Sequence, residues 1–216
     1  MTNFGRSDLT DRWSCEIQEV SGLANSKSKL TDFTSMDDMV LTNSPELIGE
    51  ISESNLQANL AHDQIRIIHN RDTTDHFARH LWDGRLFLMN QGGSHHFAAA
   101  RHIASQLTVS VPLTGKLYTY SINPEAVATL RQDFSIYALS QQAEIANGFH
   151  DAMQSFKATY LLYNLPRPYE RSYAILLPNG ELRSHRVSNV LREAGAFDLG
   201  KHLTDLCKRQ VAIRNT

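Results

Sequence analysis

Hydrophobic residues recur along the chain in short segments whose spacing predicts alternating strands and helices. Apolar runs of strand length are followed by segments in which apolar residues recur at helical spacing. The predicted strands are 64–69, 85–90, 116–122 and 135–139, and the predicted helices are 45–60, 76–82, 94–107 and one that begins at Asn123-Pro124. This order predicts an α/β (α+β) fold, a mixed sheet with flanking helices.

The two ends of the chain follow different patterns. An alternation at 13–17 predicts a half-buried strand, and the polar residues of 21–44 predict a long loop or arm. Beyond 140 we predict a helix over 141–156, a strand over 159–163, a β-hairpin turning at Pro178-Asn179-Gly180, and two more helices, 188–194 and 199–212. We therefore divide the chain into an N-terminal strand and arm (1–44), a core (45–140) and an extension packed on the core (141–216).

The most informative stretch joins the strand at 85–90 to the helix at 94–107. Gly92 and Gly93 permit a tight turn, and Ser94 is predicted to be the N-cap of the helix. The backbone N–H groups and the positive dipole end of such a helix can bind phosphate, and His95 and His96 would add donors or charge. Gly-rich turns between a strand and a helix are also common packing devices, so both interpretations stay open.

The run Gly92-Gly93-Ser94-His95-His96-Phe97-Ala98-Ala99 resembles the Gly-Gly-Cys-His-Arg-Tyr-Ala-Ala signature of sulfiredoxins. It is also similar to the looser boxes of ParB proteins and of ParB-like kinases and nucleases. The resemblance implies a ParB/sulfiredoxin-like fold over the core, in which this turn holds the phosphates of a nucleotide. Ser94 stands where sulfiredoxins have their catalytic cysteine, and His96 stands where the phosphate-binding arginine is expected.

The resemblance therefore implies a nucleotide-binding protein, with Gly92, Gly93, Ser94, His95 and His96 as binding residues. The expected cofactor is ATP or another nucleoside triphosphate with Mg²⁺, and the expected activity is an ATP-dependent phosphotransferase or hydrolase. The alternative is a non-catalytic protein-binding factor on the same fold, such as an inhibitor encoded by a phage or another bacterial mobile element. We assign no catalytic residue from the sequence.

Histidine is concentrated in the middle of the chain, where seven of the ten lie between residues 62 and 102. His76 and His80 are four residues apart, which places two imidazoles on one face of the predicted helix 76–82. With His95 or His96 they form a candidate metal site. The competing interpretation is that these histidines are surface or satisfied, partly buried residues.

The composition limits the classes of partner that the protein is expected to bind. The net charge is −2, which argues against broad nucleic-acid binding, although residues 1–60 carry 10 acidic and 4 basic side chains. The two cysteines, Cys15 and Cys207, lie far apart and do not indicate a disulfide framework. With no apolar run long enough to span a membrane, we expect a cytoplasmic protein whose partners are a nucleotide or another protein.

Overall fold

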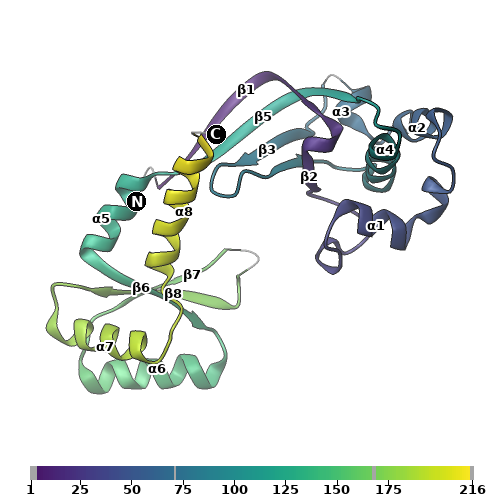
Figure 1. Cartoon of the computed structure of the whole chain (residues 1–216). Coiled ribbons are helices and arrows are strands. Elements are labelled where there is room, and N and C mark those ends of the chain that lie inside the picture. The colour runs from purple at the N-terminus through teal and green to yellow at the C-terminus, as the bar shows by residue number, and fades with distance from the viewer. Residues whose placement is uncertain (1–3, 71, 167–168, 215–216) are drawn as a thin grey trace. The chain divides into compact units, whose positions relative to one another are not determined.

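The computed structural model describes residues 4–70, 72–166 and 169–214, and it confirms the mixed α+β class (Figure 1). The described residues form eight α-helices, one five-stranded sheet and one three-stranded sheet. The chain divides into two compact units. The first unit is Arg6–Ser121, and the second consists of the described residues 4–5 and 122–214. The division falls at Ser121 and Ile122, and it joins most of the predicted N-terminal segment to the predicted core.

The first unit contains the five-stranded mixed sheet, with the strand order β1-β5-β3-β4-β2. Strand β3 pairs antiparallel with β4 and parallel with β5, while β2 pairs parallel with β4. At the centre of the sheet, Phe77 lies beside Leu88 on one side and Leu117 on the other. The strands are β1 (Gly5–Glu16), β2 (Val20–Leu23), β3 (His76–His80), β4 (Leu86–Met89) and β5 (Pro112–Ile122).

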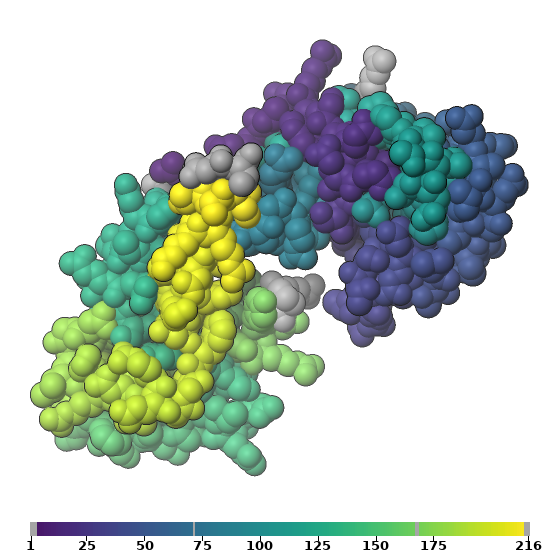
Figure 2. All heavy atoms as spheres, in the orientation of Figure 1, coloured from purple at the N-terminus to yellow at the C-terminus, as the bar shows by residue number. Residues whose placement is uncertain are grey.

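Helix α4 (Ser94–Leu107) is the central helix of this unit, and it is contacted by α1, α2 and the 3-10 turn η3. In Figure 2 the teal atoms of α4 lie between the purple N-terminal residues and the blue residues of α2. Three consecutive alanines, Ala98–Ala100, are fully buried, and their small side chains allow the neighbouring elements to approach closely. The other helical segments of the unit are η1 (Ile17–Glu19), η2 (Leu30–Asp32), α1 (Met36–Asn43), η3 (Pro45–Ile48), α2 (Glu53–Leu60) and α3 (Arg66–His69).

The second unit is built on an antiparallel sheet of order β6-β8-β7. Helix α8 lies beside α5, as Figure 2 shows, and the buried Gln210 side chain on α8 donates to and accepts from the backbone of Ile122. The elements are α5 (Pro124–Asp133), β6 (Phe134–Ser140), α6 (Ala143–Phe156), β7 (Leu161–Asn164), β8 (Ser172–Pro178), α7 (Leu182–Glu193) and α8 (Leu199–Arg214).

Two predicted elements of the first unit have the opposite secondary structure. The predicted strand 64–69 contains the short helix α3, in which Ile67 is buried and Ile68 is exposed. The predicted helix 76–82 contains strand β3, which lies between β4 and β5. Both segments are short, and a short apolar run fits either structure until its neighbours decide.

Three further predictions need correction. The predicted hairpin is wrong because only β8 precedes Pro178-Asn179-Gly180, and α7 follows it. The side chain of Asn179 caps the end of α5 instead, donating to the carbonyl oxygens of Arg131 and Gln132. The predicted arm 21–44 contains the end of β2, η2 and α1, and the predicted helix 45–60 is divided into η3 and α2.

Candidate functional site

A polar cleft of about 650 Å³ opens at the start of α4. Its lining comes from four segments of the first unit, within 25–27, 43–47, 62–64 and 91–96. All five residues that the sequence analysis predicted as a binding site belong to the lining: Gly92, Gly93, Ser94, His95 and His96. The volume is in the range typical of small-molecule sites.

The turn before α4 presents backbone donors to this cleft. Gly93 is the N-cap of α4, with a left-handed backbone (φ 69°), and the first helical hydrogen bond runs from Phe97 N to Gly93 O. The prediction that Ser94 is the N-cap is therefore wrong, because Ser94 is the first helical residue. Within the described residues, the backbone N–H groups of residues 94–96 have no protein acceptor. Such free N–H groups, at the positive end of the helix dipole, favour an anion.

The second glycine of the turn has a packing role of its own. A Cβ atom on Gly93 would lie 2.7 Å from the carbonyl carbon and oxygen of Gln64 and 2.8 Å from the backbone nitrogen of Ile65. A Cβ atom on Gly92 would meet mainly the flexible Gln64 side chain, 2.9 Å from Oε1. The structure thus gives Gly93 a steric reason to be glycine, whether or not a ligand approaches the turn.

Asn90 ties the turn to the loop that follows β2. Its side chain, only 5% exposed, accepts from the Asn25 backbone N–H (3.1 Å) and donates to the Asn25 carbonyl oxygen (2.9 Å). It also donates to the carbonyl oxygen of Gly92 (2.9 Å). One buried amide therefore fixes two walls of the cleft relative to each other, as buried polar side chains with satisfied hydrogen bonds do.

The hydroxyl of Ser94 is hydrogen-bonded to this same loop. It donates to Ser26 Oγ over 3.0 Å, and Ser26 Oγ also accepts from the backbone N–H of Ser28 (3.1 Å). Ser94 is 6% exposed. The structure therefore gives Ser94 a bridging role between α4 and the loop, and its nearest hydrogen-bond partner is another hydroxyl rather than a base.

His95 lies between two serines. Its Nδ1 atom is hydrogen-bonded to Ser44 Oγ, and its Nε2 atom is 3.0 Å from Ser28 Oγ. Ser28 Oγ also accepts from the side-chain amide of Asn43, over 2.7 Å. Ser44 is 2% exposed and lies between α1 and η3, where its backbone N–H caps α1 by donating to Val40 O. Both ring nitrogens of His95 are thus engaged within the protein.

His96 stacks on His62, with ring centroids 3.8 Å apart. The amide of Asn59 donates to the carbonyl oxygens of Leu47 and Asn55, which orients its Oδ1 atom to accept from Nδ1–H of His96 (3.0 Å). Burial is the main cause that lowers the pKa of His96 from its usual 6.5. Electrostatic repulsion from His62 and His95 lowers this pKa further. The imidazole is therefore neutral at pH 7, with Nε2 as an acceptor, and it is not the charged counterpart of an arginine.

The charged groups in the lining are few. Lys27 and Glu46 are exposed residues on two different walls. Beside the cleft, the Gln91 backbone donates to Asp75 (3.1 Å), a carboxyl group that is 3% exposed and whose pKa is raised by burial. Sequence reasoning missed Lys27 and Ser44, because both lie in the segment interpreted as a polar loop or arm.

The metal hypothesis rested on a helix that does not form. On strand β3, residues four apart share a face but lie about 13 Å apart. The His76 ring contacts the Thr74 carbonyl oxygen (2.8 Å), and the His80 ring packs against Trp82, Phe87 and Tyr120. Among the described residues, no group of three or more His, Cys, Asp or Glu side chains could hold a metal ion.

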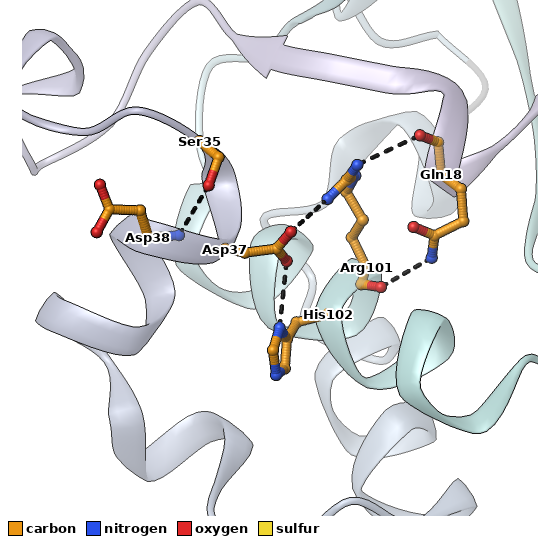
Figure 3. Close-up of polar contacts among 6 residues, drawn as sticks. All are labelled: Gln18, Ser35, Asp37, Asp38, Arg101 and His102. Carbon is orange, nitrogen blue, oxygen red and sulfur yellow. Dashed lines mark hydrogen bonds and ion pairs between the residues drawn. The ribbon is translucent and has the colours of Figure 1, made fainter.

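A second polar cluster, shown in Figure 3, holds α1 against α4. Asp37 on α1 accepts from Arg101 Nη1 (3.1 Å) and lies 3.2 Å from Nδ1 of His102, both on α4. Arg101 also reaches the carbonyl oxygen of Gln18 (3.4 Å), although its buried Nε has no partner among the described residues. Because Ser44 follows α1 and His95 lies on α4, this cluster helps set the distance between them.

The protein thus has a mixed α+β fold, and one of its two units contains a polar cleft at the N-terminus of a helix. The chain belongs to a family described as a family of unknown function (DUF6685), whose model matches residues 10–216. Comparisons with curated proteins and with solved structures gave no match. Among the described residues no helix is long and apolar enough to cross a membrane.

Proposed function

We propose that the cleft at the start of α4 binds the phosphate group of a small phosphorylated ligand, with a nucleoside triphosphate such as ATP as the expected compound. The observation that carries this proposal is the set of free backbone N–H groups of residues 94–96, which face a polar cleft at the positive end of a 14-residue helix. Mg²⁺ would enter with the nucleotide, as it usually does in such sites.

The proposal assigns different roles to the five predicted residues. The backbone from Gly92 to His96 would contact phosphate oxygens, with Gly93 allowing the turn. The rings of His95 and His96 already have protein partners, so we do not propose them as charged phosphate ligands. Lys27, exposed on the opposite loop, is a cation in the cleft lining that can pair with a phosphate.

A thermal-shift screen tests the proposal directly. The full chain is heated with ATP, ADP, CTP, GTP or pyrophosphate, each with and without Mg²⁺. A ligand present at 100 times its Kd stabilises the folded state by about 2.7 kcal/mol, which is a measurable shift. We expect at least one of these compounds to raise the unfolding temperature.

A matched pair of lysine variants locates the site. Lys27 lines the cleft, whereas Lys29 pairs with Asp32 on the surface, 2.9 Å away, outside the lining. We expect Lys27→Ala to weaken binding by about tenfold or more, the value of a charged hydrogen bond, and Lys29→Ala to leave it unchanged. If no phosphate compound stabilises the protein, the phosphate proposal fails and the protein-binding alternative is favoured.

A further inference from the structure

The hydrogen bonds around His95 form a chain that ends at a serine in the cleft. Ser44 Oγ is bonded to Nδ1 of His95, the Nε2 atom of the same ring is bonded to Ser28 Oγ, and Asn43 Nδ2 donates to that hydroxyl. A nucleophilic hydroxyl needs a base within hydrogen-bond reach, and the base needs a third group that orients it. The same order of three groups is found here: the hydroxyl of Ser44, the ring of His95 beside it, and the hydroxyl of Ser28 on the far side of that ring.

We propose that Ser44 is the nucleophile of a phosphoryl-transfer reaction in this cleft, with His95 as its general base and with Ser28 and Asn43 as positioning residues. The inference rests on the proposed function, because it takes the phosphorylated ligand as substrate. Ser44 and His95 both line the cleft, together with the turn that begins α4. The backbone N–H groups of that turn would stabilise the negative charge on the phosphoryl oxygens during transfer.

The reaction requires one particular tautomer of His95. With the proton on Nε2, this nitrogen donates to Ser28 Oγ, which uses its second lone pair to accept from Asn43. Nδ1 then carries a free electron pair that accepts the Ser44 hydroxyl proton. Asn43 is the last residue of α1 and Ser44 is the next, so the same helix end supplies the nucleophile and helps to orient its base.

The chemical steps balance without any reactant beyond water. Ser44 Oγ attacks phosphorus, its proton passes to Nδ1 of His95, and the bond from phosphorus to the leaving oxygen breaks. The leaving oxygen keeps the electron pair of that bond and takes the proton from His95. Water then attacks phospho-Ser44 and gives its proton to His95. The bond between phosphorus and Oγ breaks, Oγ regains the proton, and inorganic phosphate leaves.

An organophosphorus fluoride is the appropriate covalent probe, because a nucleophilic serine displaces its fluoride and forms a stable Oγ–phosphorus bond. The full chain is incubated with diisopropyl fluorophosphate, the intact mass is followed with time, and the adduct is located by peptide mass spectrometry. We expect one adduct, on Ser44. Peptide mapping of the wild-type chain does not depend on how any variant folds.

Two variants test the roles within the chain of hydrogen bonds. We expect no labelling of Ser44→Ala, and a rate at least about 100-fold lower for His95→Gln, the usual effect of removing a general base. Ser105→Ala is the control, because Ser105 is an exposed residue of the same helix outside the cleft.

The outcomes separate this inference from the proposed function. If a phosphate compound stabilises the chain but the probe does not label Ser44, the nucleophile is wrong and the binding site stands. Labelling that is equally fast in His95→Gln overturns the role of His95. Labelling of Ser44 in a chain that no phosphate compound stabilises overturns the assignment of a phosphoryl substrate. Labelling that depends on His95, together with stabilisation by a phosphate compound, supports both proposals.

Discussion

The two glycines before α4 have different surroundings, and this difference can be measured. Gly93 has φ 69°, and an added Cβ atom would collide with the backbone of Gln64 and Ile65. We expect Gly93→Ala to lower the free energy of unfolding by more than the 1–3 kcal/mol that is roughly typical of such backbone strain. Gly92→Ala should cost much less, because the Gln64 side chain can move. Urea unfolding of both variants measures the difference, and equal costs would contradict the packing role of Gly93.

His96 should make stability depend on pH. Its pKa is lowered in the folded protein, so the unfolded chain binds the proton more readily. The stabilisation is complete above the unfolded pKa, about 6.5, decreases as the pH falls below that value, and is gone below the lower folded pKa. We expect the free energy of unfolding to fall as the pH drops below about 6.5, by about 1.4 kcal/mol for each pH unit between the unfolded and the folded pKa of His96.

The matched variant for this prediction is His96→Gln, which keeps a side-chain donor for Asn59 but cannot titrate. Its free energy of unfolding should fall less over the same pH range than that of the wild-type protein. His80, whose pKa is also lowered by burial, is present in both proteins, so the difference isolates His96. Parallel pH profiles would show that His96 does not gain its proton more readily on unfolding.

Among the elements, those with a strong local signal were predicted correctly. Helix α4 begins at Ser94 and ends at Leu107, as its apolar spacing predicted. Helix α5 begins at Pro124 after the Asn123 cap, and β4 lies within the predicted strand 85–90. In these three cases the apolar spacing and the length of the element agree, so local sequence was sufficient.

The missed elements depend on contacts that are distant in sequence. Segment 76–80 forms strand β3 because β4 and β5 pair with its two edges, and the residues of the segment itself do not indicate this pairing.

Helix α1 was missed although it has a local signal, the Ser35 cap, in which Ser35 Oγ accepts from Asp38 N. Its predominantly polar surroundings concealed that signal. The same segment carries Lys27 and Ser44, which explains why this part of the cleft was not foreseen.

The contact between α1 and α4 can be tested through Asp37. Replacing it with alanine leaves Arg101 and His102 without their carboxylate partner, and their side chains are only 19% and 15% exposed. We expect Asp37→Ala to lower the free energy of unfolding by about 1–3 kcal/mol. The control is Asp32→Ala, which breaks an exposed pair with Lys29 and should cost about 0–1 kcal/mol. Similar losses in the two variants would contradict a stabilising role for the Asp37 cluster.

For the molecule as a whole, the candidate site belongs to one unit. Every residue that lines the cleft lies within Arg6–Ser121. The sequence predicted the turn and the helix start of this site, because a Gly-Gly turn before a helix is a local pattern. It could not predict the opposite walls, because Lys27, Ser44 and His62 reach the cleft only through the tertiary packing of their segments around α4.

This location predicts where a bound ligand protects the backbone. Hydrogen exchange reports local opening, so a ligand in the cleft should slow exchange at the amides it binds or covers. With the compound that gives the largest thermal shift, we expect slower exchange within 25–28, 43–47 and 91–97. Helices α6 and α7 of the second unit should be unaffected. The same measurement on Lys27→Ala should show weaker protection at an equal ligand concentration. Protection concentrated in the second unit would place the ligand elsewhere, and it would separate the ligand's effect on stability from the cleft at α4.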